Sequence, residues 1–406
     1  MSTKDIYQHI NLSDQNIAHT YSRFPVTIVK GDGCRVWDPQ GKEYIDFVGG
    51  LAVCNLGHCH PIIVKAIKEQ AEKLLHVSNL YYTEPQTRLA ELLIENSFAD
   101  KVFFCNSGAE ANEAAIKLAR KYSKETKGNE RFEIITMINS FHGRTIATIT
   151  ATGQEKFHRG FEPLLPGFKY VPFNDVESLD RAIDESTCAV MVEPIQGEGG
   201  VNCPVDNYLV DVRKICDKHG LLLIFDEVQV GMGRTGTLFA YEGYGIEPDI
   251  MTLAKALAGG LPIGALLAKE EIVRSFTPGS HASTFGGNPV VTASALATVK
   301  TILNDGVLDN CVEVGGYLFH EFSKLKKKYP FVKDLRGKGL IVGMELAFDG
   351  GDVVRQCIDR GVLINCTMGN ILRFLPPLTV TQGDVDIVFT ILDEIFGEIQ
   401  EDRSVG

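Results

Sequence analysis

The sequence lacks the features of secreted, membrane-spanning and nucleic-acid-binding proteins. Its 406 residues include 10 cysteines but no Cys-x-x-Cys pair, and its polar start, MSTKDIYQHINLSDQN, lacks the apolar core of a signal peptide. No apolar run approaches the roughly 18 residues that a membrane helix needs. Acidic residues outnumber basic residues by 52 to 40, and the net charge of −12 disfavours a nucleic-acid partner, because phosphate binding needs a basic face. We therefore expect a cytoplasmic protein with no nucleic-acid or membrane partner.

Strand and helix patterns alternate through the middle of the chain. With 44% hydrophobic and 23% charged residues, the chain can bury a large core and a second domain. Repeated alternation predicts an α/β fold with a mostly parallel sheet and right-handed crossovers. The expected strands of this sheet include Lys101–Cys105, Phe132–Ile138, Cys188–Val192, Leu221–Phe225 and Ile250–Ala254. After about residue 305 the pattern changes to a small α+β unit, with strands expected over Gly339–Leu346 and Val362–Asn365.

Two of these apolar runs each end at an ionisable residue. Asp226 follows the run Leu221–Phe225, and Lys255 follows the run Ile250–Ala254. Continuous apolar runs suit buried parallel strands, whose carboxyl ends meet at one edge of a sheet. A lysine amine there can form a Schiff base with an aldehyde, and a carboxylate can keep the ring nitrogen of pyridoxal 5′-phosphate (PLP) protonated. The spacing alone equally allows an ordinary ion pair that caps two strands.

Other candidate residues also follow expected strands. Ser107–Ala109 opens a helix, where free N–H groups and the helix dipole attract a phosphate, although simple helix capping explains the same residues. Phe141 could stack on a flat cofactor and Arg144 could clamp a carboxylate; the alternatives are a core phenylalanine and a solvated arginine. Glu193 and Glu198 lie on a Gly-rich loop after the third expected strand.

Three further patterns need separate treatment. Gly231–Gly236 spells the GxGxxG of dinucleotide-binding proteins but has no helix pattern after it, which disfavours a nicotinamide or flavin site. His58–His60 places three potential ligands side by side, without the spacing of a zinc site, so we expect a turn and no metal. Arg373 stands in an apolar run, a costly place for a charge unless it is paired or used.

Seven motifs, taken in order, resemble those of the class III (ω-type) PLP-dependent aminotransferases. They are SGAEANEAAIKLAR, FHGRT, EPIQGEGG, IFDEVQVGMGRTG, LAKALAGGLPIGA, STFGGNP and LRFLPP. The resemblance extends from about Tyr21 to the C-terminal helix. It implies PLP fold type I: a large domain with a doubly wound, mostly parallel seven-stranded sheet, a small α+β domain formed by both chain ends, and a homodimer. We accordingly expect an N-terminal segment 1–60 that packs with the small domain, a large PLP-binding domain 61–304 and a small domain 305–406.

The resemblance also implies a role for each candidate residue. Lys255 would hold the cofactor and move protons, Asp226 would pair with the ring nitrogen, and Glu198 would mask Arg373 in one half-reaction and release it for glutamate or 2-oxoglutarate. The implied cofactor-binding residues are Ser107, Gly108, Ala109, Phe141, Asp226, Gln229, Lys255 and Thr284 of the partner subunit. The implied substrate-binding residues are Tyr21, Arg144, Glu198, Ser283 and Arg373.

The N-terminal motifs HTYSRFPV and GGLAVCNLGHCHP are similar to those of class members that act on acylated ornithine. Leu51 stands where ornithine-specific members resemble one another in carrying a tyrosine. The resemblance implies transfer of the δ-amine of N2-acetyl-L-ornithine to 2-oxoglutarate, giving N-acetyl-L-glutamate 5-semialdehyde and L-glutamate in arginine biosynthesis, with N-succinyl-diaminopimelate as a further donor. Two alternatives stay open. One is another ω-aminotransferase, acting on succinylornithine, ornithine or 4-aminobutyrate, and the other is a PLP-dependent aminomutase or racemase.

Overall fold

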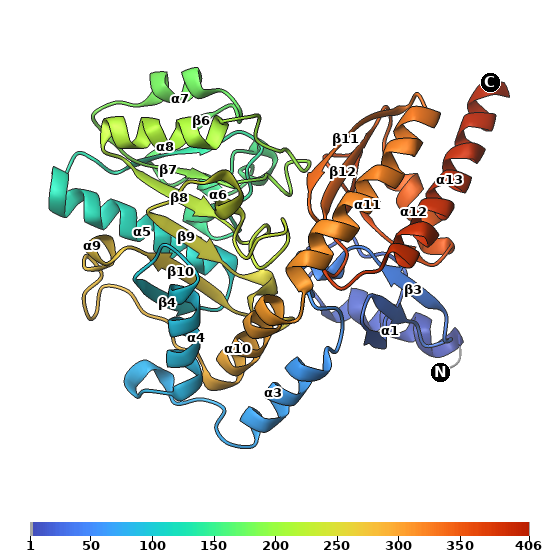
Figure 1. Cartoon of the computed structure of the whole chain (residues 1–406), viewed down its shortest axis with the longest axis horizontal. Coiled ribbons are helices and arrows are strands. Elements are labelled where there is room, and N and C mark those ends of the chain that lie inside the picture. The colour runs from blue at the N-terminus through green and yellow to red at the C-terminus, as the bar shows by residue number, and fades with distance from the viewer. Residues whose placement is uncertain (1–2, 406) are drawn as a thin grey trace.

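The computed structural model describes residues 3–405, and their side chains from residue 9 to residue 403. Figure 1 shows one large sheet with helices around it on one side of the molecule, and two smaller sheets near both chain ends on the other. The large sheet has seven strands, and only β10 runs antiparallel to its neighbours. In spatial order the strands are β4 (Lys101–Cys105), β10 (Gly264–Ala268), β9 (Ile250–Leu253), β8 (Leu222–Asp226), β7 (Thr187–Val192), β5 (Glu133–Met137) and β6 (Phe168–Val171). The predicted mostly parallel, seven-stranded sheet is confirmed.

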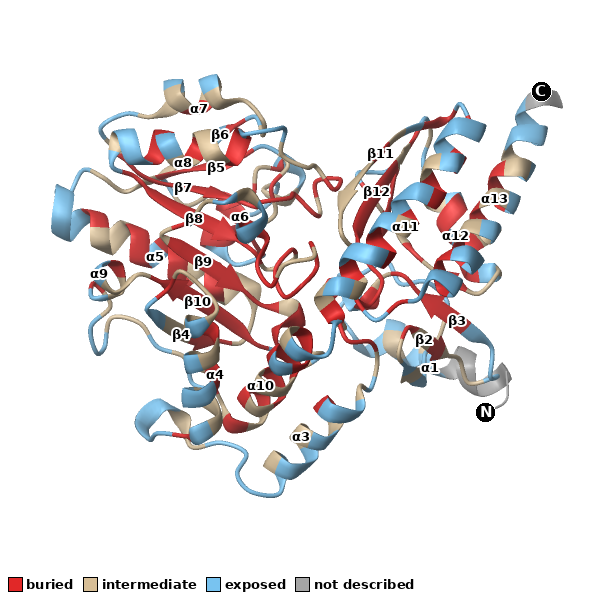
Figure 2. Cartoon of the chain, in the orientation of Figure 1, coloured by how far each residue is buried: buried red, intermediate tan, exposed pale blue. Residues whose placement is uncertain are grey.

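Helices cover both faces of the large sheet. Figure 2 shows that the strands between these helices are largely buried. Ala189 and Met191 of β7 belong to one apolar cluster together with helices α5 (Gly108–Lys127), α6 (Ile146–Ala151) and α9 (Glu270–Val273). Val190 and Val192, which alternate with them, belong to the cluster on the other face, which includes residues of α4 (Glu84–Glu95), α8 (Tyr208–His219) and α10 (Pro289–Asn304). Burial on both faces explains why these strands are continuous apolar runs in the sequence.

The remaining helices are shorter or belong to the chain ends. They are α1 (Thr3–Asn16), α2 (Gly49–Ala52), α3 (Pro61–Ala71), α7 (Val176–Ala182), α11 (Val307–Lys328), α12 (Gly351–Asp359) and α13 (Gln382–Val405). Short 3₁₀ turns are η1 (Ser78–Leu80), η2 (Glu155–Phe157), η3 (Ala240–Tyr244) and η4 (Lys255–Ala258). Within residues 3–405, none of the helices is long and apolar enough to cross a membrane. The predicted turn at His58–His60 is confirmed, since α3 begins directly after it.

Two four-stranded sheets complete the fold, and one of them joins both ends of the chain. The first contains β11 (Val332–Lys338), β12 (Ile341–Leu346), β15 (Ile371–Phe374) and β14 (Asn365–Thr367), all antiparallel. The second contains β1 (Lys30–Asp32), β2 (Arg35–Trp37), β3 (Glu43–Asp46) and β13 (Val362–Leu363). Because β13 pairs in parallel with β3, a C-terminal strand completes an N-terminal sheet. The domain boundaries at residues 60 and 304 stay a prediction.

One strand prediction near the C-terminus was wrong, and one strand was missed. The run Val362–Asn365 is not one strand, because its first half joins β3 as β13 and its end begins β14 in a different sheet. The strand predicted over Gly339–Leu346 is confirmed as β12, which is the second arm of a hairpin. Its first arm, β11, is an edge strand whose residues are mostly part-exposed, so the sequence there does not show the apolar alternation of a buried strand.

Arg234 ties the large domain to segments from both chain ends. Its side chain is 0% exposed, and Nη1 donates to the carbonyls of Leu340 at 2.9 Å and Pro376 at 2.5 Å. Nη2 donates to Oδ1 of Asn55. Burial lowers the pKa of Arg234 to about 10, which still leaves the guanidinium charged at neutral pH. One buried cation therefore satisfies acceptors from three separate stretches of chain.

Replacing Arg234 by methionine should lower the free energy of unfolding by about 3 kcal/mol or more, because three buried acceptors lose their donor. The measurement is the midpoint of urea unfolding. Arg88→Met is the matched control, since Arg88 is exposed and pairs with Glu91 on its own helix. It should leave the midpoint unchanged. Equal effects of the two substitutions would contradict a tying role for Arg234.

Candidate active site

A cavity of about 440 Å³ opens at the carboxyl ends of the central strands. Asp226 is the last residue of β8, and Lys255 follows two residues after the end of β9 and begins the turn η4. The structure therefore brings together the two residues that the sequence placed at strand ends. Seven other predicted site residues line the same cavity: Ser107, Gly108, Ala109, Phe141, Arg144, Glu198 and Gln229.

The N-terminus of α5 faces this cavity. Ser107 caps the helix, and its hydroxyl accepts a hydrogen bond from the backbone N–H of Glu110 at 3.2 Å. A side chain on Gly108 would be excluded, because a Cβ there would lie 2.8 Å from Cγ1 of Val228. The absence of a side chain lets Val228 pack close to the first turn of the helix, whose free N–H groups and dipole favour an anion. This cradle fits a phosphate group.

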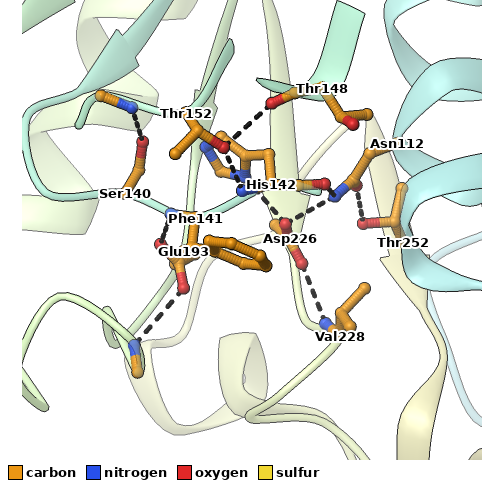
Figure 3. Close-up of polar contacts among 12 residues, drawn as sticks. Asn112, Ser140, Phe141, His142, Thr148, Thr152, Glu193, Asp226, Val228 and Thr252 are labelled. Carbon is orange, nitrogen blue, oxygen red and sulfur yellow. Dashed lines mark hydrogen bonds and ion pairs between the residues drawn. The ribbon is translucent and has the colours of Figure 1, made fainter. Parts of the chain in front are cut away.

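The carboxylate of Asp226 is held by three donors, as Figure 3 shows. Its Oδ2 accepts from Nδ2 of Asn112 at 2.7 Å and lies 2.8 Å from Nδ1 of His142. Its Oδ1 accepts from the backbone N–H of Val228 at 3.0 Å. Donors of this kind fix the direction of the carboxylate. Asp226 is 3% exposed, so its charge acts on the cavity with little screening by solvent.

A further ring of contacts orients these donors. Thr252 on β9 donates to Oδ1 of Asn112 at 2.7 Å, which leaves the amide nitrogen of Asn112 directed at Asp226. The same nitrogen donates to the backbone carbonyl of His142 at 2.7 Å, and the backbone N–H of His142 donates to Oγ1 of Thr152 at 2.9 Å. Nε2 of His142 is buried without a partner among the described residues. Of the two ring nitrogens of His142, Nδ1 is therefore bonded to Asp226, and Nε2 has no hydrogen-bond partner among the described residues.

Sequence reasoning did not assign a role to His142 or Asn112. His142 was visible inside the FHGRT motif, but a histidine next to a glycine gives no sign of its contact with a strand 84 residues away. Asn112 offered a weak signal, because it is a polar residue between the buried Ala111 and Ala114 on the inner face of α5. A polar side chain at such a position is expected to have a buried partner.

Lys255 lies in the cavity wall with the backbone in the left-handed region, at φ 42°. Burial lowers the pKa of its amine, and the carboxylates of Asp226 and Glu193 partly oppose that shift. A lowered pKa increases the fraction of neutral amine, which is the form that bonds to an aldehyde. Left-handed backbone at a residue other than glycine is costly and is often found at functional sites.

Two aromatic rings hold Arg144 at the cavity mouth. Phe141 and Phe157 meet edge to face with their centroids 5.6 Å apart. The guanidinium carbon of Arg144 lies 4.0 Å from the centroid of Phe157 and 5.5 Å from that of Phe141. The backbone N–H of Phe141 donates to the carboxyl group of Glu193 at 2.9 Å, and burial raises the pKa of Glu193 to about 7. An exposed cation is thus held in place by stacking and remains available to a carboxylate.

A second arginine is covered. Arg373 on β15 is 1% exposed, and its Nη1 lies 3.0 Å from Oε2 of Glu198 and 3.3 Å from Oε1 of Gln229. The expectation that this arginine needs a partner in its apolar run is confirmed by the ion pair. The side chain of Glu198 is 35% exposed, so the pair consists of a buried cation and a carboxylate at the surface of the cavity.

Three predicted site residues lie away from this cavity. Tyr21 is 68% exposed and has the guanidinium of Arg23 over its ring. Ser283 and Thr284 line a different cavity, where the hydroxyl of Ser283 accepts from Nδ2 of Asn106 at 3.2 Å. Within a single chain these residues do not reach Lys255, and their roles stay predictions.

Among the described residues, the histidines and acidic residues do not form a metal centre that competes with this cavity. His58 is engaged by Asp46, with Nε2 and Oδ2 2.7 Å apart. In the part of the chain that the structure describes, no group of three or more His, Cys, Asp or Glu side chains is arranged to hold a metal ion. The glycines at 231–236 form turns without a following α-helix, unlike a dinucleotide-binding loop.

Comparison with known proteins identifies the class. The family model of class-III aminotransferases matches residues 16–396, and the chain belongs to this family. Among solved structures, the ornithine aminotransferase of Toxoplasma gondii is similar with a TM-score of 0.95 at 34% identity, over 99% of this chain and 97% of that one. The acetylornithine aminotransferase of Elizabethkingia anophelis is similar with a TM-score of 0.87 at 34% identity, over 97% and 99% of the two chains. The fold type that the motifs implied is confirmed.

Curated relatives are more similar in sequence. The acetylornithine aminotransferase of Caldanaerobacter subterraneus subsp. tengcongensis is 54% identical to this chain, over 96% of this chain and 100% of the relative. The acetylornithine aminotransferase of Methanocaldococcus jannaschii is 53% identical, over 97% and 98% of the two chains.

Class III aminotransferases use PLP, and a Toxoplasma gondii ornithine aminotransferase structure reports PLP at its active site. The residues of this cavity fit that cofactor. It offers an amine with a lowered pKa, a fixed buried carboxylate and a helix N-terminus without a side chain at Gly108. These three groups suit an aldehyde, a pyridine nitrogen and a phosphate, respectively.

Asp226→Asn should lower kcat about 10²–10⁴-fold, because a neutral amide cannot stabilise a charge on the cofactor ring. The amide would also place a donor against Asn112 or His142. The measurement is kcat with glutamate as amine donor, alongside the visible absorption of bound PLP to verify loading. Asp352→Asn, at an exposed residue of α12, is the control and should leave kcat unchanged. Unchanged kcat in a fully loaded Asp226→Asn variant would contradict this role.

Proposed function

We propose that this enzyme transfers the δ-amine of N2-acetyl-L-ornithine to 2-oxoglutarate, giving N-acetyl-L-glutamate 5-semialdehyde and L-glutamate. The observation that carries the proposal is the presence of two arginines with different surroundings. Arg144 is exposed beside Phe157, whereas Arg373 is buried and covered by Glu198. This arrangement suits an enzyme that alternates between a substrate with one carboxylate and a substrate with two. The curated relatives described above support the choice of acetylornithine.

The predicted residues that line the cavity each have a task in this reaction. PLP supplies an electron sink that stabilises negative charge on the carbon next to the reacting amine. Lys255 would hold the cofactor and would move a proton at the substrate carbon as general acid and base. Asp226 would keep the ring nitrogen protonated. Ser107, Gly108 and Ala109 would bind the phosphate, and Phe141 and Gln229 would bind the ring of the cofactor.

The two arginines divide the two half-reactions between them. Acetylornithine has one carboxylate, which pairs with Arg144 while Glu198 keeps Arg373 covered. Glutamate and 2-oxoglutarate have two carboxylates, so the second takes the place of Glu198 on Arg373. A bidentate carboxylate contact to a buried arginine compensates for the ion pair that is lost. An aminomutase or racemase would have no dicarboxylate half-reaction for this pair to serve.

Acyl specificity has a candidate determinant in Leu51. It lies on α2 with φ 64° and is 46% exposed, two residues before Val53 in the cavity wall. An apolar side chain provides no hydrogen bond to a free α-ammonium, which would be desolvated without compensation. The structural neighbour that acts on ornithine makes ornithine the second candidate donor.

Paired kinetics test the substrate. We expect kcat/KM for acetylornithine to exceed that for ornithine by at least about tenfold. This ratio corresponds to about 1.4 kcal/mol for desolvation of the α-ammonium of ornithine without a compensating hydrogen bond. Leu51→Tyr adds a hydroxyl and should reduce the ratio, whereas Leu51→Met should preserve it. A higher kcat/KM with ornithine or 4-aminobutyrate would overturn the substrate, and turnover without 2-oxoglutarate would indicate an isomerase.

We also propose a cytoplasmic homodimer. The segment 74–82 exposes several large apolar side chains, and Phe285, next to Thr284, is 60% exposed and contacts the ring of His76. The exposed members of the segment are Leu74, Leu75, Leu80, Tyr81 and Tyr82. A contiguous apolar surface of this kind suits a subunit interface. A second copy seated there could bring Thr284 to the cofactor phosphate.

The cysteines support the cytoplasmic location. All ten cysteines are free thiols, as is usual in a reducing compartment.

Sedimentation tests the dimer. The wild-type protein should have twice the mass of one chain, and Leu80→Glu should yield monomers with impaired activity, because it places a charge in the interface. Val205→Glu, at another exposed apolar residue, is the control and should remain dimeric. A fully active wild-type monomer would contradict the role of Thr284.

A further inference from the structure

The main chain around Glu198 is attached to the small antiparallel sheet. Thr367 on β14 donates its hydroxyl hydrogen to the carbonyl oxygen of Glu198. Arg336 on β11 donates from Nε to the carbonyl oxygen of Gly200 at 3.0 Å. The side chain of Glu198 itself makes an ion pair with Arg373 and is 35% exposed. The loop backbone is therefore anchored, while its carboxylate reaches across to the covered arginine.

One face of β14 orients both members of this ion pair. Asn365 and Thr367 are two residues apart, so their side chains point to the same side of the strand. Oδ1 of Asn365 accepts from Nε of Arg373 at 3.3 Å, and the two residues are directly opposite each other in the β14–β15 pairing. Thr367, 5% exposed, holds the backbone of Glu198 from the same face. A short strand thus fixes the cation through one side chain and the carbonyl of the anion through the next.

We propose that Thr367 is a positioning residue that sets how firmly Glu198 covers Arg373, and thereby how well the enzyme discriminates between substrates with one carboxylate and substrates with two. This inference rests on the proposed function of the Glu198–Arg373 pair and adds the residue that controls it. Thr367 acts through Glu198, because its hydroxyl bonds the carbonyl of Glu198 and Thr367 is not one of the residues that line the cavity.

The physical reason is the conformational entropy that the loop around Glu198 would lose when the ion pair forms. An ion pair forms readily only if its partners are already held within reach, because ordering a flexible segment costs free energy. The bond from Thr367 keeps the backbone of Glu198 close to Arg373, so closing the pair requires only a side-chain rotation. A dicarboxylate binds only the open form, and its apparent affinity falls with the fraction of closed enzyme. Loosening the anchor should therefore favour dicarboxylates selectively.

The test compares Thr367→Val with Thr367→Ser in the PLP-loaded enzyme. Valine keeps the shape of threonine without the donor, and serine keeps the donor. Binding of glutarate, a dicarboxylate, and pentanoate, a monocarboxylate of equal length, is measured by calorimetry. We expect Thr367→Val to bind glutarate about 2- to 12-fold more tightly, as for loss of one hydrogen bond, with pentanoate unchanged. Thr367→Ser should behave like the wild type, and KM for 2-oxoglutarate should follow glutarate binding while kcat stays constant.

A double-mutant cycle isolates the mechanism. In a Glu198→Ala background the gate is absent, so Thr367→Val should no longer change the affinity for glutarate. An effect that persists there, an equal change for pentanoate, or weaker glutarate binding by Thr367→Val would each overturn the inference. If Thr367→Val does not fold, Thr367→Cys, a weaker donor, must show the same selective gain for glutarate, and its failure to do so would also overturn it.

The outcome is distinguishable from failure of the proposed function. Glutarate and pentanoate contain neither an amine nor a ketone, so their binding does not depend on acetylornithine as donor. A wild-type enzyme that ignores acetylornithine overturns the substrate and leaves the gate test intact. A wild-type enzyme that uses acetylornithine, with no selective effect of Thr367→Val, overturns the role of Thr367 alone.

Discussion

A single buried carboxylate, that of Asp226, is the constraint on which the rest of the site depends. It is 3% exposed and lies at the end of a central strand, where a charge is tolerated only if donors surround it. Asn112 from α5, His142 from the loop after β5 and the backbone of Val228 supply those donors. Satisfying this carboxylate therefore fixes a helix, a loop and a strand relative to one another. The same contacts place the N-terminus of α5, Phe141 and Lys255 around one cavity.

The large sheet carries the residues that fit the cofactor, and the small antiparallel sheet carries the arginine of the gate that we propose. The residues that fit the cofactor lie on β8, β9, α5 and the loops beside them. Arg373 and Thr367 come instead from the small antiparallel sheet, and they meet Glu198 on a loop of the large domain. Arg234 joins the same two parts through buried backbone acceptors. The gate that we propose would respond to the second carboxylate of a substrate while the cofactor site stays fixed.

Much of this arrangement could be predicted from local sequence, and some of it could not. Asp226 and Lys255 were predictable because continuous apolar runs identify buried parallel strands, and the ends of such strands converge. The cap at Ser107 was equally visible. The contact of His142 with Asp226 spans 84 residues and that of Thr367 with Glu198 spans 169, and no local pattern encodes such pairs. The split of residues 362–367 between two sheets was hidden for the same reason, since pairing partners far along the chain decide it.

The most direct test of the central claim is the visible absorption of the purified, PLP-loaded enzyme during stepwise addition of substrates. Acetylornithine alone should abolish the absorption of bound PLP, because the amine passes to the cofactor and remains there. Subsequent 2-oxoglutarate should restore it, because Arg373 becomes available to the second carboxylate. An absorption that acetylornithine leaves unchanged would overturn acetylornithine as the amine donor, and an absorption that returns without 2-oxoglutarate would contradict a transaminase built around Asp226, Lys255 and a gated Arg373.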